Sequence, residues 1–585
     1  MTEAVRLVIW DLDDTFWRGT ISEGAIEYRQ DLHDCVIELA QRGIMSSICS
    51  KNDHETIRDY LTERGVWDYF IFPSINWEPK GQRVQAIIDA VQLRPASILF
   101  IDDNPGNINE ALHYVPELQV AAEADAAAIL SDPLFKGKND SGLSRLKQYK
   151  ILEQRKADEI AAGSDNREFL RSSGIKVTID HDVPANIDRA VELVNRTNQL
   201  NFTKSRLSEI PEIAAAELIA LVSRYNVQSG LISVRDNYGD YGVCGFYAIK
   251  TLGSESTLIH YCFSCRILNM GVEAWVYDLI GKPKLTVVGD VLTDIHAQEE
   301  TPDWINVDAA ETEARRAIKS DLVATRGGCN LTSLSHYFST GGARTVGEFN
   351  IQRNGLDVRR DHSIFLRYAI AGTTEEQQRE LTRMGFDAED YNLGLFNPSD
   401  QPVWLLSFWA DADFPVYKHK TLDLYVPFNL QFPGRPGNLT ETEFSALPKH
   451  LQTDWMADTL KHFAANYEYV GLTPREIFEE NLRMLLDRAP HEALVYVLGN
   501  NEYRKTPDDP KILMSWKKSA NDRTKEVLSR YTNAHFLDVH DFIKSDEEVE
   551  NDPNHFNRIV YFRIYEHIYA DVGNIRSAAG LNAAE

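Results

Sequence analysis

The first residues that could do chemistry are two aspartates near the N-terminus. Asp11 and Asp13 follow directly after the apolar run 7–10. Two carboxylates spaced in this way can act differently on one phosphate, with Asp11 attacking phosphorus and Asp13 moving a proton to the leaving group. Two aspartates at this spacing also occur in solvated turns. The interpretation as a phosphate site therefore depends on partner residues further along the chain.

Further polar residues stand at the ends of later apolar segments. Ser50 ends the run 45–50, Lys80 lies in WEPKG, and Asp102 and Asp103 follow 98–101. A serine can hydrogen-bond a phosphate oxygen, and a lysine can neutralise phosphoryl charge. A phosphate among so many carboxylates needs a hard cation such as Mg²⁺. Asp102 and Asp103 are both suitable as metal ligands, and the predicted ligand set is Asp11, Asp13 and Asp102.

The elements that must position these residues alternate along the first 120 positions. The pattern predicts strands at 6–10, 45–50, 70–75 and 97–102, and helices at 34–43, 55–65 and 84–91. Such alternation indicates a parallel sheet wrapped by helices. Ligands of such sheets bind outside the carboxyl ends of the strands, where the polar residues above are found.

Together, DLDDT, Ser50, Lys80 and the DD pair resemble the four motifs of the haloacid dehalogenase (HAD) phosphatase superfamily. The resemblance implies that Asp11 is the nucleophile, Asp13 the acid/base and Asp102 a Mg²⁺ ligand. The intervals 15–50 and 50–80 are too short for a sizeable cap domain. The substrate, another domain or a partner protein must therefore close the site.

The longer strings VIWDLDDTFWRGTISEG, ICSKND, INWEPKG and FIDDNP resemble one branch of that superfamily, the FkbH-like glyceryl transferases. The strings LVNRTNQLNFTKSRLS, VRDNYGDYGVCGFYAI and CFSCRILNMGVE extend the resemblance to about residue 300, through a second half related to GNAT acyltransferases. Asp14 and Phe16 depart from the usual Asn and Leu. Membership implies 1,3-bisphosphoglycerate as the acyl phosphate donor, an enzyme thioester, and commonly an acyl carrier protein thiol as acceptor.

Cys265 is the predicted thioester nucleophile. It ends an apolar segment and is followed by Arg266 and a predicted helix start, and both features would lower a thiol pKa. His260 is a possible base. The alternative is an inert core cysteine, and no second ligand pair supports a zinc site with Cys262. Possible substrate contacts are Asn198, Gln199, Asn201 and Asp240, although such residues are common in turns.

A third group of motifs comprises RGGCN, VLGNNE and DPNHF, whose order resembles the SGNH/GDSL hydrolase superfamily. Cys329 stands where that family has its nucleophilic serine, and Asn501 matches the oxyanion asparagine. His555 would deprotonate Cys329, and Asp552 would orient the imidazole. A cysteine favours acyl transfer over ester hydrolysis; the alternative is a degenerate site with a non-catalytic cysteine.

The 585 residues therefore divide into a HAD-like Rossmannoid domain without a cap (1–145), a linker helix and GNAT-like α+β domain (146–300), a linker (301–320) and an SGNH-like α/β domain (321–575). The net charge of −27 argues against nucleic acid as the main partner and against anionic membranes. No apolar run approaches the ~20 residues of a membrane span. We expect a cytoplasmic protein with six reduced cysteines and no membrane insertion.

Three functions remain open. The first is an acyltransferase that dephosphorylates a glyceryl group, loads it onto a cysteine and passes it to a carrier-protein thiol or to a sugar or polyketide hydroxyl. The second is a Mg²⁺-dependent phosphatase fused to binding domains, and the third is a non-catalytic carrier-protein scaffold. An acidic carrier protein would need a basic docking patch, for which residues 353–360 or 314–319 are available.

Overall fold

The computed structural model describes residues 3–24, 26–162, 166–252, 255–296, 300–308, 322–391, 394, 402–430, 437–504, 511–550 and 552–578. The chain forms two compact units: Met1–Ile175 with Arg235–Tyr241, and Lys176–Val234 with Gly242–Glu585. We describe each unit by itself. The finer division into domains stays a prediction.

The first unit contains a five-stranded parallel sheet of order β5-β4-β1-β6-β7. Its strands are β1 (Leu7–Trp10), β4 (Met45–Ser50), β5 (Ser74–Ile75), β6 (Ile98–Ile101) and β7 (Gln119–Ala121). Its helices include α1 (Gln30–Gln41), α2 (His54–Glu63), α3 (Lys80–Val91), α4 (Pro105–Tyr114), α5 (Ser144–Ala162) and α6 (Asn166–Ser172). A short hairpin, β2 (Trp17–Arg18) and β3 (Glu27–Tyr28), follows β1.

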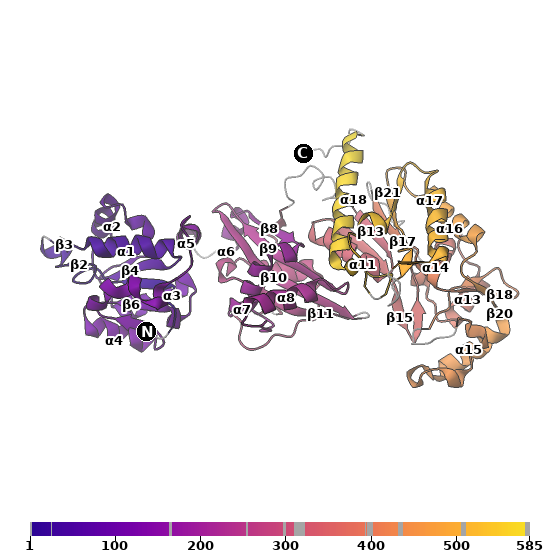
Figure 1. The fold of residues 1–585 in the computed structure, drawn as a ribbon, viewed down its shortest axis with the longest axis horizontal. Coiled ribbons are helices and arrows are strands. Elements are labelled where there is room, and N and C mark those ends of the chain that lie inside the picture. Colours follow the sequence, from indigo (N-terminus) through magenta and orange to yellow (C-terminus); the bar gives the residue numbers. More distant parts are fainter. Residues whose placement is uncertain are drawn as a thin grey trace. The chain divides into compact units, whose positions relative to one another are not determined.

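Alternate residues of β1 build the two cores of this sheet. Val8 and Trp10 pack with α1 and α2, whereas Leu7 and Ile9 pack with α3 and α4. The two helix pairs accordingly lie on opposite faces of the strands (Figure 1). The predicted alternation of strands and helices is confirmed, and it places the carboxyl ends of β1, β4 and β6 along one edge.

The prediction of a strand at 70–75 is wrong for most of its length. Only Ser74 and Ile75 pair as a strand. Phe72 has a φ of 45°, which leaves the extended region, and Pro73 lacks the N–H that a strand interior needs.

The second unit begins with a mixed α/β section whose sheet has the order β11-β10-β9-β8-β12. The strands are β8 (Ile175–Asp180), β9 (Val227–Arg235), β10 (Asp240–Leu252), β11 (Glu255–Phe263) and β12 (Ile305–Val307). The helices are α7 (Ile187–Arg196), α8 (Pro211–Val222) and α9 (Val272–Leu279). β10 and β11 pair antiparallel, with a bulge between Ala248 and Ile249.

A second parallel sheet follows, of order β14-β13-β17-β21-β24. Numbered along the chain this is 2-1-3-4-5, one of the two common doubly wound orders. The strands are β13 (Leu322–Gly327), β14 (Arg344–Phe349), β17 (Val403–Ser407), β21 (Leu494–Leu498) and β24 (Ala534–Leu537). The flanking helices are α11 (Cys329–Thr340) and α18 (Arg558–Ala578) on one face, and α12 (Ile364–Ala371), α16 (Arg475–Arg488) and α17 (Ser515–Leu528) on the other.

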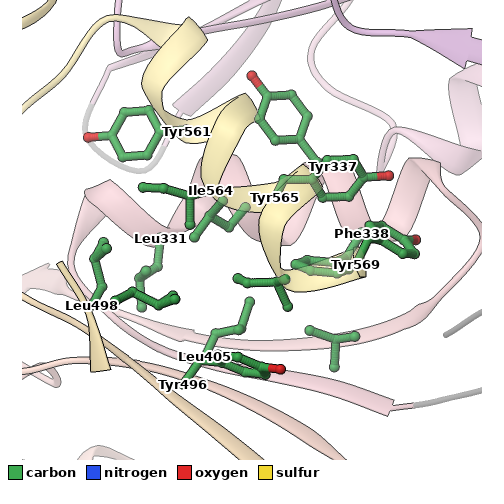
Figure 2. Packing of buried hydrophobic residues seen from close by; sticks show 14 of the residues in the cluster. Leu331, Tyr337, Phe338, Leu405, Tyr496, Leu498, Tyr561, Ile564, Tyr565 and Tyr569 are labelled. Carbon is green, nitrogen blue, oxygen red and sulfur yellow. The ribbon is translucent and has the colours of Figure 1, made fainter. Parts of the chain in front are cut away.

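Aromatic side chains fix α11 on this sheet. Figure 2 shows Tyr337 and Phe338 of α11 against Tyr565 and Tyr569 of α18. The Phe338 and Tyr569 rings stack with centroids 5.2 Å apart. This packing holds the C-terminal half of α11 against α18, and only Gly328 separates the start of α11 from the end of β13.

Smaller elements complete the second unit. They are β15 (Ile351–Arg353), β16 (Leu356–Val358), β18 (Val416–His419), β19 (Tyr425–Val426), β20 (Tyr467–Gly471), β22 (Tyr503–Arg504), β23 (Ile512–Leu513), α13 (Glu375–Arg383), α14 (Ala410–Asp413) and α15 (Asp454–Asn466). Within the described part of the chain, no helix combines the length and apolar character needed to cross a membrane. Among the described residues, Cys35, Cys49, Cys244, Cys262 and Cys265 form no disulfide.

Candidate functional site

A buried lysine joins two aspartates at the carboxyl edge of the first sheet. Asp11 follows β1, Asp102 follows the neighbouring β6, and Lys80 is the first residue of α3. The Lys80 ammonium lies 2.6 Å from Oδ1 of Asp11 and 2.7 Å from Oδ2 of Asp102. All three side chains are buried, so the lysine charge offsets two carboxylates that water barely reaches.

The carboxylates suited to hold a metal ion are Asp11, Asp102 and Asp103. Their oxygens lie within 4.8 Å of one another. Asp102 is fixed because its Oδ1 accepts hydrogen bonds from the Asn104 amide and the Asn107 side chain, both at 2.9 Å. Oxygen ligands of this kind suit Mg²⁺.

This group differs from the predicted ligand set in one residue. The predicted ligand Asp13 does not belong to it, and Asp103 does. The reason is that both carboxylate oxygens of Asp13 accept hydrogen bonds. Oδ1 accepts from Trp17 Nε1 at 2.8 Å and from the Ile21 amide at 3.2 Å. Oδ2 accepts from Asn52 Nδ2 at 3.0 Å.

Asn52 connects Asp13 to the phosphate-binding serine of the prediction. Its amide nitrogen also lies 3.1 Å from Ser50 Oγ, to which it donates. Ser50 and Asn52 are both buried. The edge thus carries two groups of contacts: Asn52 joins Asp13 to Ser50, and Lys80 joins Asp11 to Asp102.

Burial and charge act in opposite directions on this site. Burial raises the pKa of Asp11 to about 6, although Lys80 opposes the shift and Asp102 adds to it. Burial raises the pKa of Asp103, with the Asp102 charge adding to the effect. Burial would lower the pKa of Lys80, but the charges of Asp11 and Asp102 outweigh it and raise that pKa. An added cation would favour the ionised carboxylates.

The two departures from the FkbH-like pattern have local explanations. Asp14 has a φ of 53°, a left-handed conformation that Asp and Asn tolerate best among residues with a side chain. Its carboxylate accepts a 2.7 Å hydrogen bond from the Gly19 amide. Phe16 is fully buried and contacts the ring of Trp10 edge-on.

Cys265 contacts one of the polar residues singled out near it. Its thiol donates to Oε1 of Gln199, with 3.1 Å between sulfur and oxygen. Burial raises the pKa of Cys265 to about 11, which corrects the expected lowering by Arg266 and a helix start. Cys265 begins only a short 3₁₀ turn, and α9 does not start until Val272.

The other residues considered around Cys265 have separate contacts. His260 is buried on β11, and burial lowers its pKa to about 4. Asn198 accepts from the Lys204 ammonium, and Asn201 donates to the carbonyl of Val194. Asp240 begins β10 and is exposed.

The third group of motif residues is brought together in part. Asp552 Oδ2 lies 2.9 Å from Nδ1 of His555. Asn501 donates to the carbonyl of Pro553, between those two residues, at 3.1 Å. Cys329 is the first residue of α11, but its side chain lies outside the described residues.

A residue of the preceding section covers the imidazole of this group. The rings of Tyr225 and His555 have centroids 4.2 Å apart. Burial acts to raise the pKa of Asp552, but hydrogen bonds from His555 and the Asn554 amide outweigh it and lower that pKa. The carboxylate therefore stays ionised, as a residue that orients a histidine requires.

The basic stretch 353–360 does not form a free basic patch. Arg353 and Arg360 both pair with Asp390, and Arg359 pairs with Asp361. The expected docking patch is therefore neutralised within the fold. The other stretch, 314–319, lies outside the described residues.

Sequence reasoning did not single out three residues of the first site. Asn52, Trp17 and Asn107 each donate a hydrogen bond to a motif aspartate. Asn52 and Asn107 stand two and five residues beyond motif residues, so proximity along the chain was the available signal. Nothing in the pattern distinguishes Trp17 from a core tryptophan.

Comparison with protein-family models finds no match, and comparison with curated proteins finds none either. Similar solved structures include the N-terminal part of BF1531 from Bacteroides fragilis, described as containing a phosphatase domain complexed with Mg. It is 23% identical, with a TM-score of 0.21, and the match covers 24% of this chain and 42% of that one. The present chain thus spans less than half of that structure.

Two further structures match over most of their own length. An uncharacterised protein from Corynebacterium glutamicum is 21% identical, covering 23% of this chain and 98% of that one, with a TM-score of 0.18. The 3-deoxy-D-manno-octulosonate 8-phosphate phosphatase from Moraxella catarrhalis, in complex with magnesium, phosphate and KDO, is 14% identical. That match covers 28% of this chain and 95% of the phosphatase, with a TM-score of 0.17.

Proposed function

We propose that the first unit is a Mg²⁺-dependent phosphatase of the HAD type. The observation that carries the proposal is the Lys80 ammonium, which bridges Asp11 and Asp102 at the carboxyl edge of a parallel sheet. This arrangement offers a nucleophilic carboxylate, a fixed positive charge and an adjacent group of oxygen ligands. Phosphoryl transfer through an aspartyl phosphate uses these three features together.

The reaction proceeds in two displacements. An Asp11 oxygen bonds to phosphorus, and the bond from phosphorus to the leaving oxygen breaks, with Asp13 giving a proton to that oxygen. Water then attacks phosphorus, Asp13 takes a proton from it, and the Asp11 oxygen leaves. Asp13 suits this role because Trp17 and Asn52 hold its carboxylate in place two residues beyond Asp11 in the chain.

The remaining residues bind the phosphoryl group. Ser50 presents a buried hydroxyl and Lys80 a buried ammonium toward the same edge. The carboxylates of Asp11, Asp102 and Asp103 would hold Mg²⁺. Bound there, the ion would supply positive charge against the transferred phosphoryl group.

For the whole chain we propose glyceryl transfer, which rests on the FkbH-like resemblance. The sulfur of Cys265 bonds to the acyl carbon of 1,3-bisphosphoglycerate, the carbon–oxygen bond to phosphate breaks, and phosphate leaves with the electron pair. The first unit hydrolyses the remaining phosphate ester. The third group of motif residues then passes the glyceryl group to a carrier-protein thiol or to a sugar or polyketide hydroxyl. This group consists of Cys329, Asn501, Asp552 and His555.

A specific observation favours the second candidate, a Mg²⁺-dependent phosphatase fused to binding domains. Burial raises the pKa of Cys265 to about 11, so few molecules carry the thiolate that attacks an acyl phosphate. In the transferase, substrate binding would have to remove the thiol proton. Gln199 only accepts a hydrogen bond from the thiol and is no base.

Two measurements test these proposals. The first is hydrolysis of p-nitrophenyl phosphate by the full chain with Mg²⁺; turnover equal to that of Asp11→Asn would refute the phosphatase. The second is the intact mass after incubation with 1,3-bisphosphoglycerate and Mg²⁺. The transferase predicts a glyceryl adduct that Cys265→Ser removes. Phosphatase turnover without an adduct would leave the second candidate.

A further inference from the structure

Arg83 is a buried cation one turn beyond Lys80 on α3. All five of its N–H groups donate hydrogen bonds. Nε donates to the Ser74 hydroxyl at 3.0 Å, and Nη1 donates to the carbonyls of Asn76 and Glu78 at 3.0 and 3.1 Å. Nη2 donates to the Ser50 carbonyl at 2.8 Å and to the Ser74 carbonyl.

None of these five acceptors is a carboxylate. They are four main-chain carbonyls and one hydroxyl, so no countercharge offsets the desolvation of this guanidinium through its hydrogen bonds. An apolar residue could fill the same space without that cost. The guanidinium instead holds the segments that carry its acceptors in fixed positions, because its planar donors point in fixed directions.

The acceptors belong to the two segments that carry phosphate-binding groups. Ser50 is the last residue of β4, and its carbonyl also accepts from the Asn76 amide at 3.3 Å. Ser74, Asn76 and Glu78 form the connection that leads into Lys80, the first residue of α3. One side chain therefore fixes the end of β4 against the connection that delivers the lysine.

We propose that Arg83 is a positioning residue of the phosphatase site, setting the Ser50 hydroxyl relative to the Lys80 ammonium. The inference rests on the proposed phosphatase function. Arg83 acts through Ser50 and Lys80 and does not touch the substrate. A displacement of ~1 Å between groups that bind one phosphoryl group can cost ~100-fold in rate.

The alternative is that Arg83 only stabilises the fold. A second arginine of the same unit serves as a control that distinguishes this stabilising role from the positioning role. Arg42, in the same unit, also donates to main-chain carbonyls, those of Leu130 and Phe135, although its Nε donates to the Glu38 carboxylate. None of these acceptors is Ser50 or a residue of the connection into Lys80. Arg83→Lys and Arg42→Lys both keep the charge and lose the planar donors. A stabilising role predicts similar effects for both on melting temperature and none on activity per folded molecule.

The experiment compares wild type, Arg83→Lys, Arg83→Ala, Ser74→Ala and Arg42→Lys as full chains with Mg²⁺. It measures kcat and KM for p-nitrophenyl phosphate, inhibition by orthovanadate, and melting temperature. We expect kcat/KM to fall about tenfold or more in Arg83→Lys, less in Ser74→Ala and not in Arg42→Lys. Ser74→Ala removes only the hydroxyl that accepts from Arg83 Nε. This variant therefore still tests the proposal if Arg83→Ala does not fold.

Added guanidinium should restore part of the Arg83→Ala activity and its vanadate inhibition, but leave Arg42→Lys unchanged. Equal kcat/KM in wild type, Arg83→Lys and Ser74→Ala would overturn the positioning role while leaving the phosphatase intact. A wild-type chain that neither turns over phosphate nor responds to vanadate would instead overturn the proposed function, and the role of Arg83 with it.

Discussion

The side chain of Asn52 holds Asp13, donating to its Oδ2 at a distance of 3.0 Å. The same nitrogen donates to Ser50 Oγ. One amide thus fixes the proposed proton-transfer group relative to the proposed phosphate-binding hydroxyl.

Replacing Asn52 by alanine should therefore lower phosphatase turnover by about tenfold or more, because the Asp13 carboxylate loses one of its fixed donors. Asn52→Asp should lower it further, since a carboxylate would face Asp13 with like charge. The measurement is kcat for p-nitrophenyl phosphate with saturating Mg²⁺. The exposed Asn139→Ala, in a surface turn, serves as control. Unchanged kcat in both Asn52 variants would contradict this role.

The second prediction concerns the carboxylates that would bind Mg²⁺. It expects different effects on Mg²⁺ affinity from Asp103→Asn and Asp13→Asn. Asp103→Asn should weaken Mg²⁺ binding by roughly 10–100-fold, because it removes the charge of a carboxylate within 4.8 Å of Asp11 and Asp102. Asp13→Asn should leave Mg²⁺ affinity close to wild type but abolish turnover. Isothermal titration of each full chain with MgCl₂ measures the affinities. The opposite ranking would restore Asp13 as the ligand.

The edge of the first sheet could be predicted because strand ends and their polar residues lie close together in the sequence. Asp11 after β1 and Asp102 after β6 meet because parallel neighbours end at the same edge. Asn52 reaches Asp13 across 39 positions, a pairing that follows only from side-chain directions in the folded sheet.

Two expectations failed because they depended on tertiary packing. Burial, not the adjacent Arg266, decides the pKa of Cys265, and burial cannot be read from neighbouring residues. The arginines at 353–360 look like a basic patch in the sequence, but Asp387 and Asp390 pair with two of them from a distant position.

The raised pKa of Cys265 predicts how its reactivity depends on pH. With a pKa of about 11, the thiolate fraction grows roughly tenfold for each pH unit up to about pH 10. The rate of Cys265 alkylation by iodoacetamide should rise in the same way, without levelling off near pH 8. Peptide mass mapping isolates this site from Cys35, Cys49, Cys244 and Cys262, which are all buried. A plateau near pH 8 would show an activated thiol and favour the transferase.

Gly328 gives a stability prediction at the start of α11. A Cβ at this position would lie 2.3 Å from Nε1 of Trp409, a rigid ring over which Arg359 is stacked. The backbone itself is not the obstacle, because φ at Gly328 is −79°. Gly328→Ala should therefore cost ~1–3 kcal/mol by overpacking, measured by urea unfolding of the full chain.

A double-mutant cycle identifies Trp409 as the cause. In the Trp409→Phe background the indole nitrogen is gone, so Gly328→Ala should cost less than in wild type, and the difference is the coupling energy. Gly142→Ala, where an added Cβ meets nothing within 4 Å, provides the unstrained control. Equal costs of Gly328→Ala in both backgrounds would show that the Trp409 indole is not the source of the cost.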